Sequence, residues 1–432
     1  MQAYRASILH LLDDPGRDGP TKNAEAVAFH EDGLLLVEDG HVVACGDWAA
    51  LSDLIGDTPV EDLTGKLITS GFIDTHIHFP QVDIIAAHGA QLLDWLEQHT
   101  FPAEAAFADP DHATEAAEFF VDELLRNGTT TALVFGSVHK GSVEALFRAA
   151  LSRDMRLIAG KSLMDRNAPD GLTDTVESSR ADMEGLIADW HGKGRLGYAV
   201  TPRFAISCTD AQLAMAGELL AANPGVWMQT HLSENQREID ETAALFPQAT
   251  DYLDVYDRFG LLGPRSVFAH CVHLKGEAFA RLAAKGGAVA FCPTSNLFLG
   301  SGLFPLEAAC AHGVKVGIGT DVGAGTTFSI LHTLGEAYKV GQLRGTALDP
   351  FHALYLATLG GARALDLGDR IGNLAPGKEA DFLVLDLAAT PLLTRRLAGD
   401  RSLENRLFAL TVLGDDRVVE RTYLAGRLRH AR

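Results

Sequence analysis

The sequence predicts an α/β fold in which a TIM-like (β/α)8 barrel carries a small β-sandwich domain formed by both chain ends. Buried-type apolar strands alternate eight times with amphipathic helical segments through the middle of the chain. Short strands separated by turn signals occupy both ends. We therefore expect residues 1–65 and 375–432 to form the sandwich and residues 66–374 to form the barrel. A doubly wound open sheet is the alternative, but no G-x-G-x-x-G follows an early strand.

The sequence pattern of both terminal segments indicates β-hairpins. Residues 26–47, AVAFHEDGLLLVEDGHVVACGD, contain three apolar runs separated by Glu-Asp-Gly and Asp-Gly, which are hairpin signals. Near the other end, EADFLVLD at 379–386 and DRVVERTYLAGRLRH at 416–430 are again strand-like, with a turn expected at Gly426. The two ends therefore have matching β-patterns that can build one domain.

The barrel strands are expected where apolar runs are continuous, because strands of parallel sheets are buried on both faces. These runs lie at 67–76, 129–136, 156–164, 195–202, 225–231, 266–272, 287–292 and 314–320. Amphipathic helices are expected between them, for example at 142–154, 209–223 and 275–287. Ser142, Thr209 and Lys275 lie near the helix starts, and Gly286 ends the third of these helices.

The composition argues against several classes of partner. The formal net charge is −21, so the chain repels phosphate backbones and anionic lipid, and we expect no nucleic-acid or membrane partner. A small neutral or weakly basic substrate fits better. The five cysteines are odd in number and form no C-x-x-C, which indicates reduced thiols in the cytoplasm. We expect no signal peptide, and no window approaches the roughly 18 apolar residues of a membrane span.

Histidines and acids follow four of the expected strands, whose carboxyl ends converge on one mouth of a barrel. His76 and His78 lie two residues apart, so both imidazoles face the same side of a strand. The other candidates are His231 and Glu234 after the fifth strand, His270 and His273 on the sixth, and Asp321 after the eighth. Each has a structural alternative, such as a turn for Asp321, and we expect His273 to lie outside the site. Together they favour a catalytic zinc or iron site with an open position.

This order of ligands resembles that of the amidohydrolase superfamily of metal-dependent hydrolases, and GNLAPGKEADFLVLD at 372–386 resembles the family's return to its β-domain. Members with two metals carry a carbamylated lysine at the end of the fourth strand. Here that strand ends with Arg203, and Lys161 lies one strand earlier. The resemblance therefore implies one Zn²⁺ per chain, with iron as the alternative metal, as in the deaminase branch.

Six longer stretches resemble the guanine-deaminating branch of that superfamily: residues 74–104, 201–208, 231–239, 269–274, 292–302 and 319–329. Within the first, GAQLLDWLEQHTFPAE at 89–104 is especially characteristic. Just before the first stretch, this chain has S-G-F at 70–72 where the branch commonly has P-G-F, a difference outside the site. The resemblance implies hydrolytic conversion of guanine to xanthine and ammonia by a homodimer. Another aminopurine, a pterin or a triazine is the alternative substrate, and a non-enzymatic assembly protein is the alternative class.

Residue roles follow from the resemblance position by position. It implies that the metal is held by His76, His78, His231 and Asp321, while His270 either binds the metal or holds the attacking water. The catalytic residues implied are Glu234, which moves protons, with Asp321 and His270. The implied guanine-binding residues are His78, Gln81, Arg203, Phe204, His231, Glu234 and Asp321. The structural alternatives are a helix cap for Glu234, a salt bridge for Arg203, a core aromatic for Phe204 and a loop amide for Gln81. Asn296 is expected in the scaffold or the pocket lining.

Overall fold

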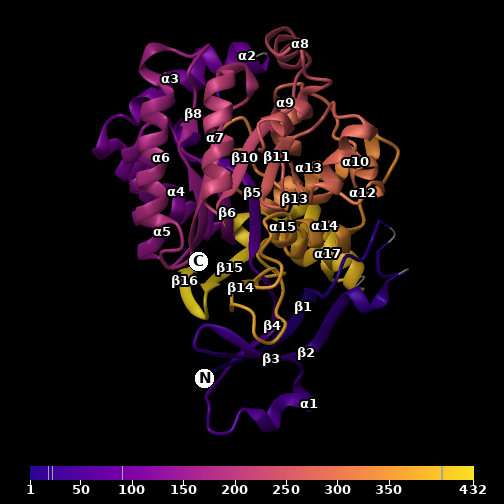
Figure 1. Cartoon of the computed structure of the whole chain (residues 1–432). Helices are drawn as coiled ribbons and strands as arrows, with labels where there is room; N and C mark the ends of the chain where they lie inside the picture. The colour runs from indigo at the N-terminus through magenta and orange to yellow at the C-terminus, as the bar shows by residue number, and fades with distance from the viewer. Residues whose placement is uncertain (18, 22, 90, 400–401) are drawn as a thin grey trace. The chain divides into compact units, whose positions relative to one another are not determined.

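The computed structural model describes residues 1–17, 19–21, 23–89, 91–399 and 402–432 (Figure 1). Ala90, within the characteristic stretch at 89–104, lies outside these residues. The chain divides into two compact units, one of residues 1–73, 122–131 and 328–432, the other of residues 74–121 and 132–327. The domain boundaries at 65 and 375 stay a prediction. Within the described residues, no helix is both long and apolar enough to cross a bilayer.

Both chain ends build one β-domain, as the sequence predicts, but its seven described strands form one mixed sheet where a sandwich was expected. Its order is β16-β15-β14-β4-β1-β2-β3, and only β1 and β4 among these neighbours run parallel. The strands are β1 (Gln2–Leu11), β2 (Val27–Glu38), β3 (His41–Asp47), β4 (Val60–Ser70), β14 (Phe382–Leu385), β15 (Val419–Leu424) and β16 (Arg427–Ala431). The stacked rings of Phe382 and Tyr423, 4.3 Å apart, lie in the core of this sheet.

One of the expected turns is wrong. The Glu-Asp-Gly sequence at 31–33 lies inside β2, which continues through it as a single strand paired with β1. The Arg5 guanidinium donates to both oxygens of Asp32 across this pair, and a Cβ on Gly33 would lie 2.8 Å from Ile8. Gly33 therefore serves close approach of two strands here. The Asp39–Gly40 turn is confirmed, with φ of 49° and 80°, and so is the turn at Gly426.

The eight expected barrel strands are confirmed, although the first begins at Phe72 and not at residue 67. They follow the order β13-β12-β11-β10-β9-β7-β6-β5. Their bounds are β5 (Phe72–His78), β6 (Thr129–Phe135), β7 (Arg156–Gly160), β9 (Leu196–Pro202), β10 (Trp227–Leu232), β11 (Ser266–His270), β12 (Ala288–Phe291) and β13 (Lys315–Ile318), and β8 (Ser162–Leu163) also pairs with β9. Past the end of β13, the Asp321 amide donates to the His76 carbonyl at 2.9 Å. The first and last strands therefore meet, which closes the barrel.

The expected strand 67–76 is in fact two strands. β4 ends at Ser70 in the terminal sheet, β5 begins at Phe72 in the barrel, and Gly71 lies between them. The Gly71 amide donates to the Asp381 carbonyl at 2.9 Å, and a Cβ at this position would clash with the Thr130 hydroxyl. The sequence reading merged the two strands because apolar residues lie on both sides of Gly71, although Thr69 and Ser70 interrupt the apolar run.

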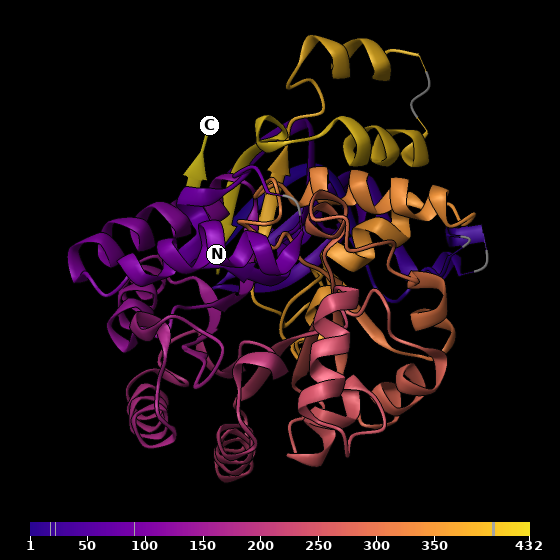
Figure 2. The same ribbon diagram turned by 90° about the horizontal axis from the view of Figure 1, so that it is seen from above.

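Helices follow the barrel strands. Those between residues 140 and 258, purple to pink, lie on the outer side of the strands (Figure 2). The helices of the barrel unit are α2 (Leu92–Trp95), α3 (Phe101–Ala106), α4 (Pro110–Arg126, which ends in the other unit), α5 (Lys140–Ser152), α6 (Val176–Trp190), α7 (Asp210–Ala222), α8 (Gln236–Leu245), α9 (Tyr252–Arg258), α10 (Gly276–Ala284), α11 (Pro293–Phe298) and α12 (Leu306–Ala311). Thr209 caps α7 by accepting from the Gln212 amide, as its position predicts.

The terminal unit carries its own helices. They are α1 (Trp48–Leu51), α13 (Ile330–Leu343), α14 (Pro350–Ala357), α15 (Leu359–Ala364), α16 (Pro391–Leu397) and α17 (Leu403–Leu413). Several start at side-chain caps: Ser329 caps α13, Asp349 caps α14 and Ser402 caps α17. Pro350 follows Asp349 at the first position of α14, where a missing N–H costs no helical hydrogen bond.

Candidate metal centre and active site

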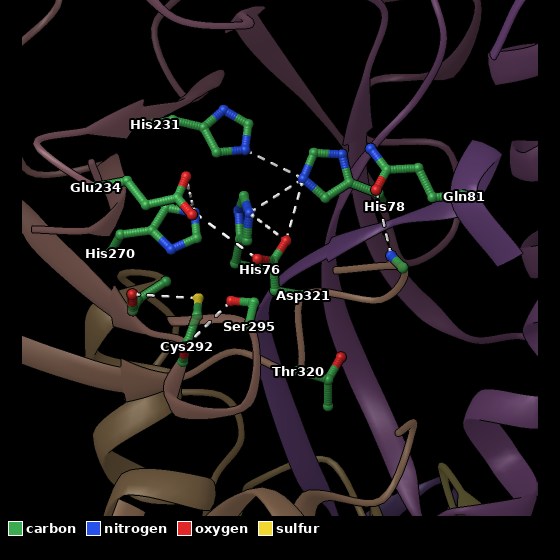
Figure 3. Close-up of polar contacts among 12 residues, drawn as sticks. His76, His78, Gln81, His231, Glu234, His270, Cys292, Ser295, Thr320 and Asp321 are labelled. Carbon is green, nitrogen blue, oxygen red and sulfur yellow. Dashed lines mark hydrogen bonds and ion pairs between the residues drawn. The ribbon is translucent and has the colours of Figure 1, made fainter. Parts of the chain in front are cut away.

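The ends of four barrel strands bring the predicted ligands together (Figure 3). His76 and His78 lie at the end of β5, His231 is in β10, and His270 is the last residue of β11. Asp321 follows β13 by three residues. His76, His78, His270 and Asp321 are at most 4% exposed. The site is therefore removed from bulk water, which strengthens every electrostatic interaction in it.

The ligand atoms of these residues point at one another. One nitrogen each of His76, His231 and His270 and one oxygen of Asp321 all lie within 4.8 Å of one another. His78 belongs to the same group, because its Nε2 lies 3.1 Å from His231 Nε2, 3.2 Å from His76 Nε2 and 3.3 Å from Asp321 Oδ1. Five side chains thus converge as a cation-binding set would, and the structure brings together every metal ligand that the sequence predicts.

The outer nitrogens of two imidazoles are held by oxygen acceptors. His231 Nδ1 donates to the Arg203 carbonyl at 2.5 Å, and His270 Nδ1 donates to Asn296 Oδ1 at 2.8 Å. Because these oxygens only accept, Nδ1 carries the proton in both rings and Nε2 keeps a lone pair directed at the site. His270 Nε2 is buried and has no hydrogen-bond partner among the described residues. Such an orphaned nitrogen fits a metal ion or a water molecule bound there.

Burial and charge set the protonation of this cluster. Burial lowers the pKa of His76, of His78 to about 4, and of His231 to well below its ordinary value. Burial acts to raise the pKa of Asp321, but His76 and His78 outweigh it and hold that pKa well below its usual range. Neutral imidazoles with one carboxylate are the donor set that divalent transition metals prefer, so the residues present fit such an ion.

Asp74 orients this cluster from behind, a role that the sequence reading missed. Its carboxylate accepts from the His76 amide at 3.1 Å, the Thr320 amide at 3.1 Å and the Thr320 hydroxyl. Asp74 thus ties the H-x-H segment to the residue before Asp321. Its position two residues before His76 was the signal available in the sequence.

Glu234 lies beside the ligands. Its Oε2 is 3.4 Å from His270 Nε2, and its Oε1 accepts from the Ser301 hydroxyl at 3.1 Å. Burial first, and the Asp321 charge second, raise the pKa of Glu234 to about 8. This carboxyl can therefore hold or release a proton near neutral pH. The helix-cap alternative for Glu234 is wrong, because Asn235 caps α8 and forms the capping box with Glu238.

One pocket contains all the predicted substrate-binding residues. It is lined by His78, Gln81, Arg203, Phe204, His231, Glu234 and Asp321, together with His270 and apolar side chains that include Leu92, Trp95, Leu96 and Leu299. Its lining combines a few polar groups with apolar side chains, the usual construction of a small-molecule site. Figure 3 shows Gln81 beside His78 and Glu234 beside His270.

Other candidates lie outside this pocket. His273 Nε2 contacts the Ser301 carbonyl at 2.9 Å and does not line the pocket, as expected. Lys161 is fully buried in ion pairs with Asp174 at 2.6 Å and Asp182 at 3.2 Å. Its ammonium therefore has structural partners.

Sequence reasoning missed Glu104. This buried carboxylate accepts from Arg203 Nη1 and from Gln81 Nε2. It is the last residue of the characteristic stretch at 89–104, which was the available signal. Asn296 was expected as scaffold or lining, and it orients His270 instead of lining the pocket.

A closed parallel barrel with an imidazole and carboxylate cluster at its strand ends defines the class of metal-dependent hydrolases. The chain belongs to the amidohydrolase family, whose model matches residues 67–429. The predicted family is thereby confirmed.

The chain is particularly similar to guanine deaminases of two organisms. The chain is 54% identical over 433 residues to guanine deaminase of Escherichia coli strain K12, covering 100% of this chain and 98% of that protein. The solved structure of the E. coli guanine deaminase superimposes with a TM-score of 0.97 at 52% identity and 100% coverage of both chains. Guanine deaminase from C. acetobutylicum, solved with guanine bound in its active site, gives a TM-score of 0.89 at 29% identity, covering 99% of this chain and 100% of that one.

Proposed function

We propose that this chain is an enzyme that deaminates guanine by hydrolysis and releases xanthine and ammonia. One observation carries the proposal: a protonatable Glu234, a buried Arg203 and four of the five predicted metal ligands line a single pocket. The 54% identity to E. coli guanine deaminase along the whole chain supports the same substrate. No nucleophilic side chain is needed, since water is the attacking group.

The metal that we propose is one Zn²⁺ per chain, held by His76, His78, His231 and Asp321, with His270 as a ligand or as the holder of the attacking water. Iron is the alternative, because imidazole and carboxylate also suit it. When bound, such an ion supplies a Lewis acid that makes a water molecule nucleophilic near neutral pH. Lys161 is occupied by Asp174 and Asp182, which supports a single ion.

Glu234 is proposed to move the protons. Its carboxyl lies next to His270 Nε2 and faces the pocket, so it can take a proton from the attacking water and give it to a ring nitrogen of guanine. A pKa raised to about 8 matches this exchange, because a proton shuttle works best near the operating pH. Asp321 stays ionised and assists the second proton transfer to the leaving ammonia.

Arg203 is proposed to recognise the O6 acceptor of guanine. Attack at C2 requires the 2-amino group to face the cluster, so O6 lies farther from it, and a guanidinium is a strong donor. Adenine has an amino group in place of O6 and would leave the buried guanidinium facing a donor. Sites built on such a hydrogen bond reject the wrong analogue by roughly 10⁴–10⁵. Phe204, 6% exposed, lines the same pocket and is proposed to pack against the guanine ring.

The deciding experiment mixes zinc-loaded protein with guanine and measures ammonia and xanthine. Adenine, a pterin and a triazine are tested in parallel, because they represent the alternative substrates of the same scaffold. We expect stoichiometric ammonia and xanthine from guanine and negligible release from adenine. Arg203→Ala should lower kcat/KM for guanine by more than about tenfold without loss of metal. Comparable turnover of adenine, or none of guanine, would overturn the proposal.

We further propose a homodimer that works in the cytoplasm without nucleic-acid or membrane partners. None of the five cysteines forms a disulfide, which suits a reducing compartment. The net charge of −21 disfavours polyanionic partners. Light scattering on the eluting protein tests the dimer, and a mass of one chain at working concentration would contradict it.

A further inference from the structure

Glu104 is a buried carboxylate whose partners are two predicted guanine-binding residues. Arg203 Nη1 lies 2.8 Å from Glu104 Oε1 and 2.6 Å from Oε2, and Gln81 Nε2 donates to Oε1 at 3.0 Å. The side chains of Glu104 and Arg203 are 1% and 3% exposed. An ion pair this deeply buried stabilises the fold only when its geometry is held in place. Removing one partner leaves an unpaired buried charge.

The fold holds this geometry from one short helix. Phe101 and Glu104 lie three residues apart on α3 and therefore share a face. Phe101 packs against the guanidinium, whose Cζ is 5.6 Å from the ring centroid, while Glu104 takes its Nη1 group. The π-helical turn Leu96–Thr100 precedes α3, and its residue Leu96 lines the pocket. Such turns are frequent at functional sites.

Glu104 also fixes which end of the Gln81 amide faces which neighbour. The Gly323 amide donates to Gln81 Oε1 at 3.3 Å, and a carboxylate can only accept, so Nε2 must be the atom beside Glu104. Both oxygens of Glu104 accept from Arg203 Nη1, so the Nε and Nη2 groups of Arg203 remain as donors. Arg203 and Gln81 both line the pocket. This wall therefore offers N–H donors to a bound molecule.

We propose that Glu104 is the positioning residue that sets the hydrogen-bond polarity of the substrate pocket. By accepting from Arg203 and Gln81 together, it turns their remaining donors toward a ligand with ring acceptors, such as a purine with an oxo group at C6. Glu104 acts through these two residues. The proposal rests on the proposed guanine deamination and explains how a purine is selected there.

The test compares guanine with 2-aminopurine, which carries the same 2-amino group and lacks O6. Glu104→Gln keeps the size of the side chain and removes the charge that holds Arg203. We expect kcat/KM for guanine to fall by at least about tenfold, mainly through KM, because a charged hydrogen bond to the substrate is weakened. For 2-aminopurine the fall should be less than about threefold, since no O6 contact exists to be lost. Metal content should match the parent. Glu115→Gln, an exposed acid on α4, is the control and should change neither substrate.

The double variant Glu104→Gln/Arg203→Met separates positioning from a general structural role. If Glu104 acts through Arg203, replacing Glu104 in the Arg203→Met background should lower kcat/KM for guanine by less than about threefold. This double variant also removes both buried charges, so it remains measurable if Glu104→Gln alone does not fold. The proposal would be overturned if Glu104→Gln lowered kcat/KM equally for guanine and 2-aminopurine. It would also be overturned if Glu104→Gln lowered kcat/KM for guanine equally in the parent and in Arg203→Met.

The proposed function is judged separately on the parent. If the parent binds guanine without releasing ammonia, the proposed deamination is wrong. The effect of Glu104→Gln on guanine relative to 2-aminopurine is then measured from the dissociation constants of both purines on zinc-loaded protein. A parent that binds both purines equally, with Glu104→Gln unchanged, would contradict the role of Glu104 itself.

Discussion

His270 Nδ1 donates a hydrogen bond of 2.8 Å to Asn296 Oδ1, and this contact fixes the imidazole nitrogen that faces the ligand cluster. Asn296 lies on α11, directly after β12, so a neighbouring barrel strand delivers the orienting group to the histidine of β11. The amide is buried and its oxygen can only accept, so in the neutral imidazole the proton lies on Nδ1 and Nε2 keeps its lone pair.

Replacing this acceptor should therefore weaken the metal site. Asn296→Leu has similar size but cannot accept, so the His270 ring loses its fixed tautomer. We expect metal affinity or kcat/KM to fall by about 10–100-fold, the usual effect of removing the partner of a ligating histidine. Titration with a competing chelator and steady-state kinetics measure both. Asn296→Asp keeps an acceptor and should lose less, and Asn223→Ala, at the end of α7, is the control. Unchanged metal binding and activity in Asn296→Leu would contradict this role.

Metal content tests the ligand cluster directly. Elemental analysis of protein purified without added metal should find near one equivalent of zinc per chain. His78→Ala removes a nitrogen that lies within 3.3 Å of three other candidate ligands, so metal and activity should fall together. A chelator should abolish the parent's activity, and added zinc should restore it. Two equivalents of metal, both needed for turnover, would show that the single-ion assignment is wrong.

Glu234 should act on protons without holding the metal. Glu234→Gln preserves the shape of the side chain and its contact with Ser301, but it cannot take a proton. We expect kcat to drop by about 10²–10⁴ with metal content unchanged. Glu241→Gln on the exposed side of α8 should leave kcat at the parent value. Loss of metal from Glu234→Gln would move this residue into the ligand set.

The sequence predicted those parts of the molecule that depend on local pattern. Continuous apolar runs located all eight barrel strands, because buried parallel strands need apolar side chains on both faces. His76 and His78 were recognisable because a strand places residues two apart on one side. Gly71 shows the limit: the chain changes sheets there, yet apolar residues stand on both sides and the short polar interruption at Thr69 and Ser70 was read as part of one strand.

The orienting residues were not predictable in the same way. Asp74, Glu104 and Asn296 act through contacts between different elements, and their residue types are common in turns and helices. Glu104 lies 99 residues from Arg203 in the sequence, so no local spacing pairs them. Only the fold reveals that a carboxylate on α3 reaches a guanidinium after β9. The helix start after β10 was readable, but its cap proved to be Asn235, one residue beyond Glu234.

The terminal unit predicts a defined acid sensitivity through His10. Its side chain is 3% exposed, its Nδ1 accepts from the Leu374 amide at 3.3 Å, and its Nε2 lies 3.7 Å from Cys45 Sγ. Burial first, and then the nearby His30 and Lys378, lower the pKa of His10 from 6.5 to about 4. The unfolded chain therefore takes up a proton below about pH 6.5 that the folded chain refuses until about pH 4.

Stability should accordingly be complete above pH 6.5 and should decline as the pH falls toward 4, with His10 accounting for at most about 3 kcal/mol of the loss. His10→Asn keeps an acceptor for the Leu374 amide and removes the titration. The difference in free energy of unfolding between parent and variant, measured by urea denaturation at several pH values, should be constant above pH 7 and shift in favour of the variant below about pH 6. His41→Asn, at an exposed position on β3, controls for loss of an imidazole as such. If parent and His10→Asn lose stability in parallel down to pH 4, His10 is not the group responsible.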